Sequence, residues 1–493
     1  MRLGHRRSIG RCRTVALCIE ALFLPQHAVL RLFHPSAKGR AEEPGADQTS
    51  NTVSVIDPVG NRLLGVIRLG DPVPGALSPL YRGELLVHGL GYSPDGTTLA
   101  VVSVGSNSVT LIETATNRVK GKVYVGRSPH EAFFTSDGRE LWVTVRGENY
   151  VSVIDPTLMK ETRRIEMANG PGMTMFGPDG RYAFVCSSFT PEMAILDVTT
   201  HQILKRVPQA SPFCPNIAVS PDNDEVWITL KDVGKVQVFS ARPPFDQRAL
   251  LETGPITNHV NFVNNGNGKF AYVTIGGADE VKVFRRGASP TLVATVPVGP
   301  LPHGVWPAGD GSRVYVALEN GEMAVAIDTL TNKVIATIPI GQTTQALVYV
   351  PGAVPDGAGI ENLAPLGEAG NTTRLQLQSA GTAAPAAQAS VAVNSLGLLD
   401  LVQIAAKGLA PTSQYQVYLA DSNEAPFGRL EPLVVLKTNP DGAGIVQALG
   451  PLKTLAPQAS GAAAASSGRY LVVSELQDPS HIVLRQATPS SSR

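Results

Sequence analysis

One internal repeat constrains the fold of this 493-residue chain more than any other feature. Asn51–Asp57, Asn107–Glu113 and Asn149–Asp155 read NTVSVID, NSVTLIE and NYVSVID. Weaker copies end at Asp197, Phe239, Phe284 and Asp328. After a first interval of 56 residues, the copies follow one another at 42, 42, 42, 45 and 44 residues. Each copy alternates its side-chain character with period two, which is typical of a half-buried strand.

Further strand signals surround each copy. A second apolar run precedes most copies, as in Trp142–Val145, Trp227–Leu230, Tyr272–Ile275 and Tyr315–Leu318. An Asp-Gly turn stands before that run, and Gly accepts the positive φ that a tight hairpin turn requires. Another strand follows, as in Lys333–Ile340. Each unit of about 42 residues therefore predicts four strands and no helix, which is the content of a propeller blade.

The phrases YVTI at Tyr272–Ile275 and NYVSVID at Asn149–Asp155 resemble the YVTN β-propeller repeat family. The resemblance covers about residues 50–351. It implies a WD40-like propeller and says little about function.

The inner strands of the predicted blades begin near His88, His130, Gly172, Pro215, Asn258, His303 and Thr344, so we expect seven blades. The last inner strand has no strands after it, and the first copy has none before it. These two halves should complete one blade and close the ring, which removes sheet edges. The segment before Asn51, Glu42–Asp47, reads as a poor strand. Either this blade has three strands or the N-terminus is not authentic.

The chain is thus predicted to be all-β, with a seven-bladed β-propeller over residues 47–351 and two flanking regions. Residues 1–46 carry arginines and then an apolar stretch, which resembles a secretory leader and predicts a periplasmic or secreted protein. The apolar run is interrupted by Glu20 and no clean cleavage site follows, so a disordered or wrongly assigned N-terminus is the alternative. Residues 352–370 read as a Gly/Pro/Ala linker. Residues 371–489 predict a small antiparallel β-sandwich-like domain, with a mobile loop over Gln458–Gly468.

Composition excludes several classes. Lys+Arg and Asp+Glu are both 41, so bulk charge does not favour a nucleic-acid partner. No stretch is long and apolar enough for a transmembrane helix. The four cysteines do not have the pattern of a disulfide framework. The sequence contains no Cys-x-x-Cys-His motif, so a covalently attached haem is not indicated. In an exported protein Cys186 and Cys214 could form a disulfide; alternatively they are two independent buried thiols.

Four histidines fall at matching blade positions, where inner strands enter the central channel: His88, His130, His259 and His303. A neutral imidazole is a common ligand of transition metals, so these residues are candidate ligand or metal contacts. The alternative is structural, because a polar residue at this position can hydrogen-bond a neighbouring blade.

Polar residues at strand ends should reach the same mouth of the channel. Arg146, Lys231 and Glu319 follow second strands, and together with Asn216 and Asn258 they could form a funnel for a small anionic or polar ligand. Singly, each of them reads as a solvated strand-end residue. The carboxylates Asp57, Asp155, Asp197 and Asp328 stand at strand ends before Pro, Val or Thr, where we expect them to cap turns.

No motif of an acyl-transfer, phosphate-binding or metalloprotease site occurs. The sequence therefore favours an extracytoplasmic binding or scaffold protein that recognises a protein, a polymer or a small ligand at the channel mouth. The alternative is a propeller enzyme, either a lactonase-like hydrolase or a metal- or redox-dependent one, that uses the channel histidines. No cofactor is indicated apart from a metal at these histidines, and the sequence does not indicate an oligomeric state.

Overall fold

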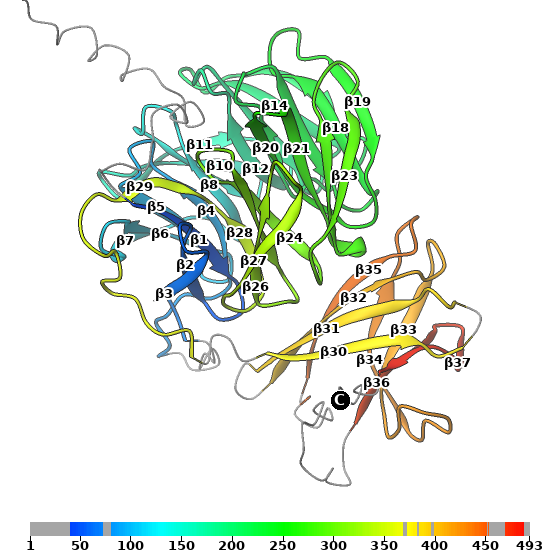
Figure 1. The fold of residues 1–493 in the computed structure, drawn as a ribbon. Helices are drawn as coiled ribbons and strands as arrows, with labels where there is room; N and C mark the ends of the chain where they lie inside the picture. Colours follow the sequence, from blue (N-terminus) through cyan, green and yellow to red (C-terminus); the bar gives the residue numbers. More distant parts are fainter. Residues whose placement is uncertain are drawn as a thin grey trace, which may run out of the picture.

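The computed structural model describes residues 40–71, 80–367, 372–381, 384–395, 399–450, 452 and 469–487 (Figure 1). Most of the suggested leader and the loop expected at Gln458–Gly468 lie outside these residues. Strands and one short 3-10 turn, η3 (Gly276–Ala278), make up the regular structure of the described part. Within it, no helix has the length and apolar character needed to cross a membrane.

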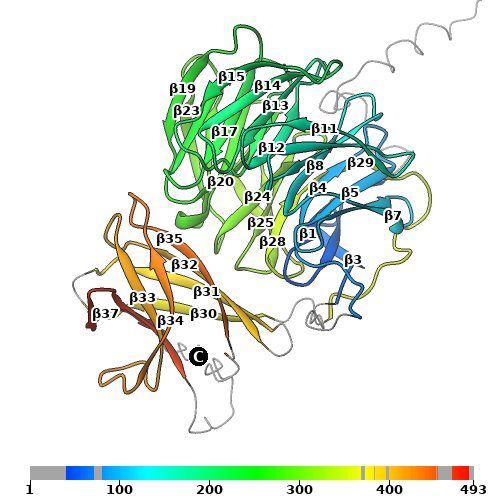
Figure 2. The ribbon, with the colours of Figure 1, turned by 180° about the vertical axis from the view of Figure 1, so that it is seen from behind.

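The propeller predicted from the repeat is confirmed. Seven antiparallel sheets succeed one another along the chain, and the rear view shows them arranged around a common centre (Figure 2). The first three complete blades contain β4 (Val87–Tyr92), β5 (Thr98–Ser103), β6 (Ser108–Glu113) and β7 (Arg118–Tyr124); β8 (Pro129–Phe134), β9 (Leu141–Val145), β10 (Tyr150–Asp155) and β11 (Lys160–Glu166); and β12 (Pro171–Phe176), β13 (Tyr182–Ser187), β14 (Glu192–Asp197) and β15 (Ile203–Pro208). The next three contain β16 (Ile217–Val219), β17 (Glu225–Leu230), β18 (Lys235–Ser240) and β19 (Gln247–Glu252); β20 (Thr257–Asn265), β21 (Gly268–Ile275), β22 (Glu280–Arg285) and β23 (Thr291–Pro297); and β24 (Pro302–Pro307), β25 (Arg313–Leu318), β26 (Met323–Asp328) and β27 (Lys333–Pro339).

The seventh blade joins the two ends of the repeat array, as expected. Its inner strand is β28 (Thr344–Leu347), and β1 (Arg40–Asp47), β2 (Thr52–Asp57) and β3 (Arg62–Arg68) complete it. The expectation of a three-stranded blade is wrong, because Arg40–Asp47 forms a strand between β28 and β2. The placement of residues 40–46 in a leader is wrong for the same reason. A strand with a partner on each side is held by its backbone ladder, so its low intrinsic propensity is overridden.

The strand after the ring runs past the boundary that the sequence suggested for the linker. β29 (Val350–Val354) pairs with β1, and Ala364 bridges to Val66. Asn117 donates hydrogen bonds to the carbonyls of Gly359 and Glu361, so part of the linker is attached to the propeller.

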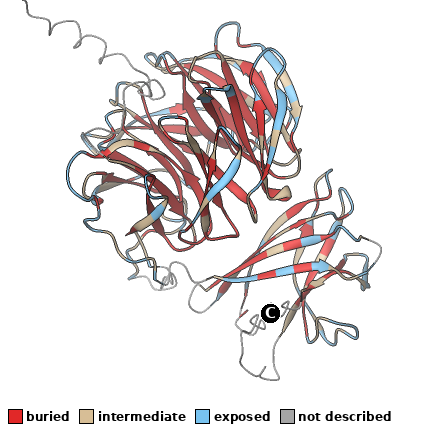
Figure 3. Cartoon of the chain, viewed as in Figure 1, coloured by how far each residue is buried: buried red, intermediate tan, exposed pale blue. Residues whose placement is uncertain are grey.

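Burial follows position within the blade. Inner and middle strands such as β8 and β9 are buried along their whole length, whereas outer strands such as β7 and β11 are largely exposed (Figure 3). Tight turns support this packing, and Gly96, for example, adopts φ 72° in an Asp-Gly turn. The strand-end carboxylates cap turns as predicted: Asp155 Oδ1 accepts hydrogen bonds from the backbone N–H groups of Thr157 and Leu158, at 2.8 and 2.9 Å.

The C-terminal domain is a single eight-stranded antiparallel sheet that curls into a barrel-like shape around its own apolar core (Figure 1). Its strands, in hydrogen-bonded order, are β34 (Leu430–Lys437), β33 (Gln414–Ala420), β36 (Tyr470–Glu475), β37 (Asp478–Gln486), β30 (Thr373–Ser379), β31 (Gln388–Ser395), β32 (Asp400–Lys407) and β35 (Gly444–Gly450). Two of these, β35 and β37, were not recognised in the sequence. Strands β32 and β35 lie nearer to the propeller than β36 does (Figures 1 and 2).

Candidate functional site

The site begins at one repeated position, the residue with which each inner strand enters the channel. Around the ring this position holds His88, His130, Gly172, Pro215, Asn258, His303 and Gln345, whereas Asn216 and His259 stand one residue further along their strands. The backbone of the neighbouring blade lies within hydrogen-bond reach. His130 Nδ1 is 2.7 Å from the carbonyl oxygen of Gly172, and His303 Nδ1 is 2.8 Å from that of Gln345. These bonds join adjacent blades, which is the structural role anticipated for the histidines.

The histidines form two pairs. The ring centroids of His88 and His130 are 4.5 Å apart, and those of His259 and His303 are 4.6 Å apart. His88 Nδ1 is 2.9 Å from Gln48 Oε1. Because a carbonyl or amide oxygen accepts, the Nδ1 of His88, His130 and His303 carries the proton, and Nε2 keeps its lone pair.

Six of the nine residues that the sequence suggested line one chamber at this mouth of the channel. They are His88, His130, His303, Arg146, Lys231 and Glu319, and the chamber has a volume of about 440 Å³. Arg146, Lys231 and Glu319 each follow directly on the second strand of a blade, which returns to the mouth where the inner strand begins.

Three suggested residues lie elsewhere. His259 and Asn216 line a much smaller void deeper in the channel. Asn216 Oδ1 accepts a hydrogen bond from the N–H of Val260, and Asn258 Nδ2 donates one to the carbonyl of Pro302, at 2.9 and 2.7 Å. The two asparagines thus connect neighbouring blades and do not belong to the chamber.

Burial keeps the histidines neutral. Burial, together with the smaller effect of the nearby Lys231 charge, lowers the pKa of His259 to about 3. Burial also lowers the pKa of His88 and His130 well below the ordinary value, and the positive charge of Arg146 acts in the same direction. The imidazoles therefore carry no charge at neutral pH, and those of His88 and His130 offer lone pairs to the chamber.

Two cations remain in the chamber. Arg146 and Lys231 form no hydrogen bond or ion pair with any residue that the structure describes. Burial lowers the pKa of Arg146 to about 10, which leaves the guanidinium charged at neutral pH. The nearest counter-charge of Arg146 is Glu131, and burial raises the pKa of this carboxyl to about 8. The positive charge of Arg146 is thus largely uncompensated.

The C-terminal sheet covers the opposite side of the chamber. Gln403, Ile445, Val446 and Gln447, from β32 and β35, line it. Gln403 Nε2 donates to Glu319 Oε1 and to Asn320 Oδ1, both at 2.8 Å.

Further contacts join the C-terminal domain to the propeller around Gln403. Lys407 Nζ pairs with Asp279 at 2.7 Å, Arg374 with Glu322 at 2.5 Å, and an apolar cluster includes Ile256, Leu301 and Ala443. The C-terminal domain is therefore part of the site.

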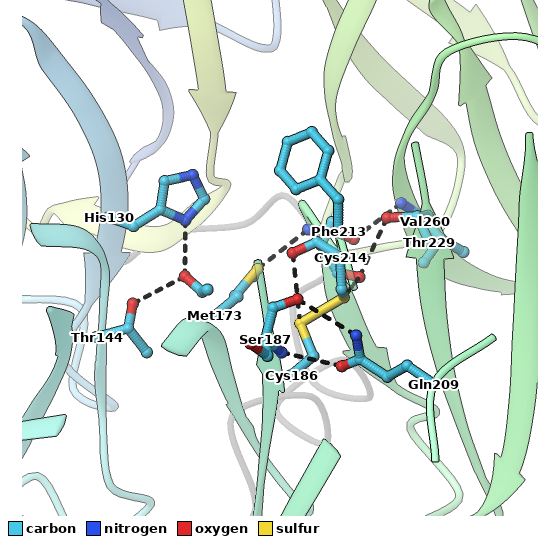
Figure 4. Close-up of a disulfide and its surroundings, with 12 residues drawn as sticks. His130, Thr144, Met173, Cys186, Ser187, Gln209, Phe213, Cys214, Thr229 and Val260 are labelled. Atoms are coloured by element: carbon cyan, nitrogen blue, oxygen red, sulfur yellow. Dashed lines mark hydrogen bonds between the residues drawn. A yellow bond between two sulfur atoms is a disulfide. The ribbon is translucent and has the colours of Figure 1, made fainter. Parts of the chain in front are cut away.

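A disulfide supports another part of the wall. Cys186, in β13, is bonded to Cys214, which precedes β16. Phe213 and Pro215 flank Cys214 and line the chamber. Figure 4 shows the Phe213 ring extending from the disulfide to the side on which His130 lies. The disulfide holds this connection beside the mouth.

Several lining residues were not recognised from the sequence. Gln345 occupies the repeated inner-strand position, so a strict alignment of the blades would have indicated it. Glu131 follows His130 directly and lines the deeper void. Gln48 directly follows β1 in the ring-closing blade, outside the repeat copies that indicated the other residues. Nothing in the sequence indicates the four residues from the C-terminal domain, since their place depends on how that domain docks.

No family model matches the chain, and no curated protein matches it either. The YVTN assignment therefore remains a resemblance of the repeat. Among solved structures, the chain is similar to a protein of unknown function from Desulfotomaculum acetoxidans, with 13% identity, a TM-score of 0.54, and coverage of 64% of this chain and 99% of that one.

Two further structures are similar. The periplasmic gluconolactonase PpgL of Pseudomonas aeruginosa has 17% identity and a TM-score of 0.51, and the match covers 63% of this chain and 99% of that one. The hydrazine synthase of Kuenenia stuttgartiensis has 18% identity and a TM-score of 0.49, and the match covers 56% of this chain and 94% of that one. At these identities, the matches to the Desulfotomaculum acetoxidans protein and to PpgL support the class, a seven-bladed β-propeller, and show nothing beyond the fold.

Proposed function

We propose that this propeller binds a small organic anion carrying a carboxylate, in the chamber between the channel mouth and the C-terminal sheet. The observation that carries the proposal is Arg146, a charged guanidinium that faces the chamber without a hydrogen-bonding partner among the described residues. Arg146 is half-buried at the wall of the chamber, and a guanidinium binds a carboxylate through two parallel charge-assisted hydrogen bonds.

The charges of the chamber set the charge of the ligand. Lys231 is close enough to Glu319 for their charges to interact, so these two largely offset one another. Arg146 then leaves about one positive charge for the ligand to neutralise. The uncharged Nε2 atoms of the histidines, the amide N–H groups of Gln48 and the amide oxygen of Gln447 offer hydrogen bonds to hydroxyl or carbonyl groups.

The size of the chamber favours a small ligand over a protein or a polymer. About 440 Å³ is at the lower end of the range of small-molecule sites. The C-terminal sheet occupies the side from which a macromolecule would approach the mouth, and its contacts with Glu319, Asn320 and Asp279 hold it there.

Thermal shift measurements on the full chain test the proposal. The probes are acetate, gluconate, citrate and inorganic phosphate, each at increasing concentration, with glucose as the neutral counterpart of gluconate. A carboxylate should raise the unfolding midpoint of the wild type, because a ligand that binds only the folded state stabilises it by mass action.

The variant Arg146→Met should lose this shift, and Arg127→Met is the matched control. Arg127 is exposed, and its guanidinium donates to the carbonyl of Gly147. The proposal fails if no carboxylate stabilises the wild type more than glucose does, or if Arg146→Met responds like the wild type.

We also propose that the protein acts outside the cytoplasm, as a periplasmic or secreted protein. The Cys186–Cys214 disulfide supports this, because such bonds persist in oxidising compartments and are rare in the cytosol. Cell fractionation combined with alkylation of free thiols tests it. A cytoplasmic protein with two reactive thiols in the folded body would refute it.

An enzymatic function is the second candidate. The lone pairs of His130 and His303 face a chamber that also holds a cation able to stabilise a developing negative charge, an arrangement suited to ester or lactone hydrolysis. Incubation with gluconolactone and other lactones, with His130→Asn as the comparison, tests this. Hydrolysis at equal rates by wild type and variant would remove the histidine from such a role.

A further inference from the structure

Three buried side chains of two neighbouring blades converge beside the chamber. His88 comes from β4, and His130 and Glu131 come from β8. One potential ligand atom of each lies within 4.8 Å of those of the other two. The three residues are 8%, 3% and 3% exposed, so bulk water does not separate them.

The hydrogen bonds of His88 and His130 use Nδ1 of each ring and leave Nε2, with its lone pair, available to a metal ion. Nδ1 of His88 donates to Gln48 Oε1, and Nδ1 of His130 donates to the carbonyl of Gly172. Metal-binding histidines usually donate their other ring N–H to an oxygen acceptor, which fixes the tautomer and orients the ring. Here this outer set of bonds is already in place.

Gly89 makes room for the carboxylate. A Cβ at position 89 would lie 2.6 Å from Glu131 Oε2 and 2.2 Å from the carbonyl oxygen of His130. Any larger residue would displace the carboxylate from its place beside His88. The glycine in β4 therefore allows an acid on one strand to lie next to a histidine on the other.

We propose that His88 Nε2, His130 Nε2 and the Glu131 carboxylate bind one divalent transition-metal ion of the zinc or ferrous class. Two histidines and one carboxylate are the ligands of open metal sites, in which the remaining positions take water or substrate. His88 and His130 line the chamber, so the open position faces it. This inference goes beyond the proposed anion binding and does not depend on it.

The charges around the ion are mixed. Arg146 is close enough to His88, His130 and Glu131 to interact with all three, and Lys231 and His259 interact with His88. The guanidinium opposes the ion, and the Glu131 carboxylate offsets one of its two charges. A bound ion adds positive charge beside Arg146, so metal binding should strengthen anion binding.

The second histidine pair provides an internal control. His259 and His303 have nearly the same ring separation, and His303 Nδ1 donates to a backbone carbonyl as His130 Nδ1 does. The nearest carboxylate oxygen, Glu319 Oε2, is 4.0 Å from His303 Nε2, and the other oxygen of Glu319 accepts from Gln403. This pair does not form a group of three with close ligand atoms in the described part of the chain.

Substitution of His130 by asparagine distinguishes a metal-binding role of this histidine from a structural one. Its side-chain N–H occupies the position of Nδ1, so His130→Asn keeps a donor for the Gly172 carbonyl but lacks Nε2. Asn258 already occupies the equivalent position in β20, where its Nδ2 donates to a backbone carbonyl of the next blade, so the fold accepts this residue there. The matched control is His303→Asn, and Glu131→Gln removes the anionic ligand.

The experiment measures metal content by mass spectrometry after the full chain has been stripped with a chelator and incubated with Zn²⁺, Co²⁺ or, without oxygen, Fe²⁺. The wild type and His303→Asn should retain about one ion per chain. His130→Asn and Glu131→Gln should fall to the background level, with unfolding midpoints showing that both are folded.

Failure of the wild type to retain any of the three ions would overturn the inference. Equal retention by His130→Asn and His303→Asn would also overturn it. The variant Arg146→Met should keep the metal while it loses the carboxylate-induced thermal shift. The metal site and the anion site can therefore fail separately.

Discussion

The ring-closing blade should make the stability of the propeller depend on pH through Asp47. This residue ends β1 and is fully buried. Its carboxyl accepts hydrogen bonds from Ser54 of β2 at 2.7 Å and from Thr344 of β28 at 2.6 Å. It therefore connects the N-terminal and C-terminal parts of the blade.

Burial raises the pKa of Asp47 to about 7 from the ordinary 3.8, although the hydroxyl groups around it act in the opposite direction. Below about pH 4 the carboxyl is protonated in the folded and unfolded states alike. Above that pH the unfolded chain releases the proton and the folded protein retains it until about pH 7, so the free energy of unfolding falls as the pH rises. At about 1.4 kcal/mol per pKa unit, the loss between pH 5 and pH 8 is about 3 kcal/mol.

Urea denaturation at constant ionic strength measures this loss. All three tryptophans of the chain, Trp142, Trp227 and Trp306, lie in the propeller, so their fluorescence reports on this domain alone. The variant Asp47→Asn should reduce the fall between pH 5 and pH 8 by about 3 kcal/mol. An asparagine can still accept from Ser54 and can donate to Thr344.

The control is Asp95→Asn. Partial burial raises the pKa of Asp95, but hydrogen bonds from Ser93 and Thr97 lower it overall. Asp95 is thus already ionised at pH 5 and stabilises the folded state equally from pH 5 to pH 8. In Asp95→Asn the free energy of unfolding should therefore fall between pH 5 and pH 8 as much as in the wild type. A wild-type stability that is constant or increases from pH 5 to pH 8 would refute the reasoning. An equal fall in the free energy of unfolding of the wild type and of Asp47→Asn would also refute it.

Three further predictions concern stability and docking. Replacing Cys186 and Cys214 by alanine should lower the free energy of unfolding by about 3.5 kcal/mol, the value expected for a loop of this length; no loss in urea denaturation would contradict it. Glu43→Met should stabilise the propeller by about 1–3 kcal/mol in the same assay, because both carboxyl oxygens of Glu43 are buried without a hydrogen-bond partner; destabilisation would show that the carboxyl is needed. Gln403→Leu should accelerate amide hydrogen exchange around Glu319 and in β32, since it removes two hydrogen bonds between the domains; unchanged exchange would mean that they do not hold the domain in place.

The propeller could be predicted from the sequence because its information is local and repeated. Period-two alternation and the Asp-Gly turns specify each hairpin, and the interval of about 42 residues specifies the blade. The segment Glu42–Asp47 was misjudged because its conformation depends on two partners, of which β28 lies about 300 residues away. Local propensity carries no signal of such a partner.

The candidate site was predictable in part for the same reason. Repeat positions indicated His88, His130 and His303, and strand ends indicated Arg146 and Lys231. Gln403 and Gln447 could not be predicted, because no pattern in the chain specifies which face of the C-terminal sheet meets the propeller. The tautomers of the histidines depend on carbonyl groups in the next blade, which only the three-dimensional arrangement reveals.

The joining of the two ends of the array in one blade has a consequence for biosynthesis. When β1 emerges from the ribosome it can pair with β2, but β28 is still about 300 residues from being made. At about 5–20 residues per second, that interval lasts roughly 15 to 60 s. Throughout it, one edge of β1 stays unpaired, so β1 is a place where a nascent chain of this protein can aggregate or bind a chaperone.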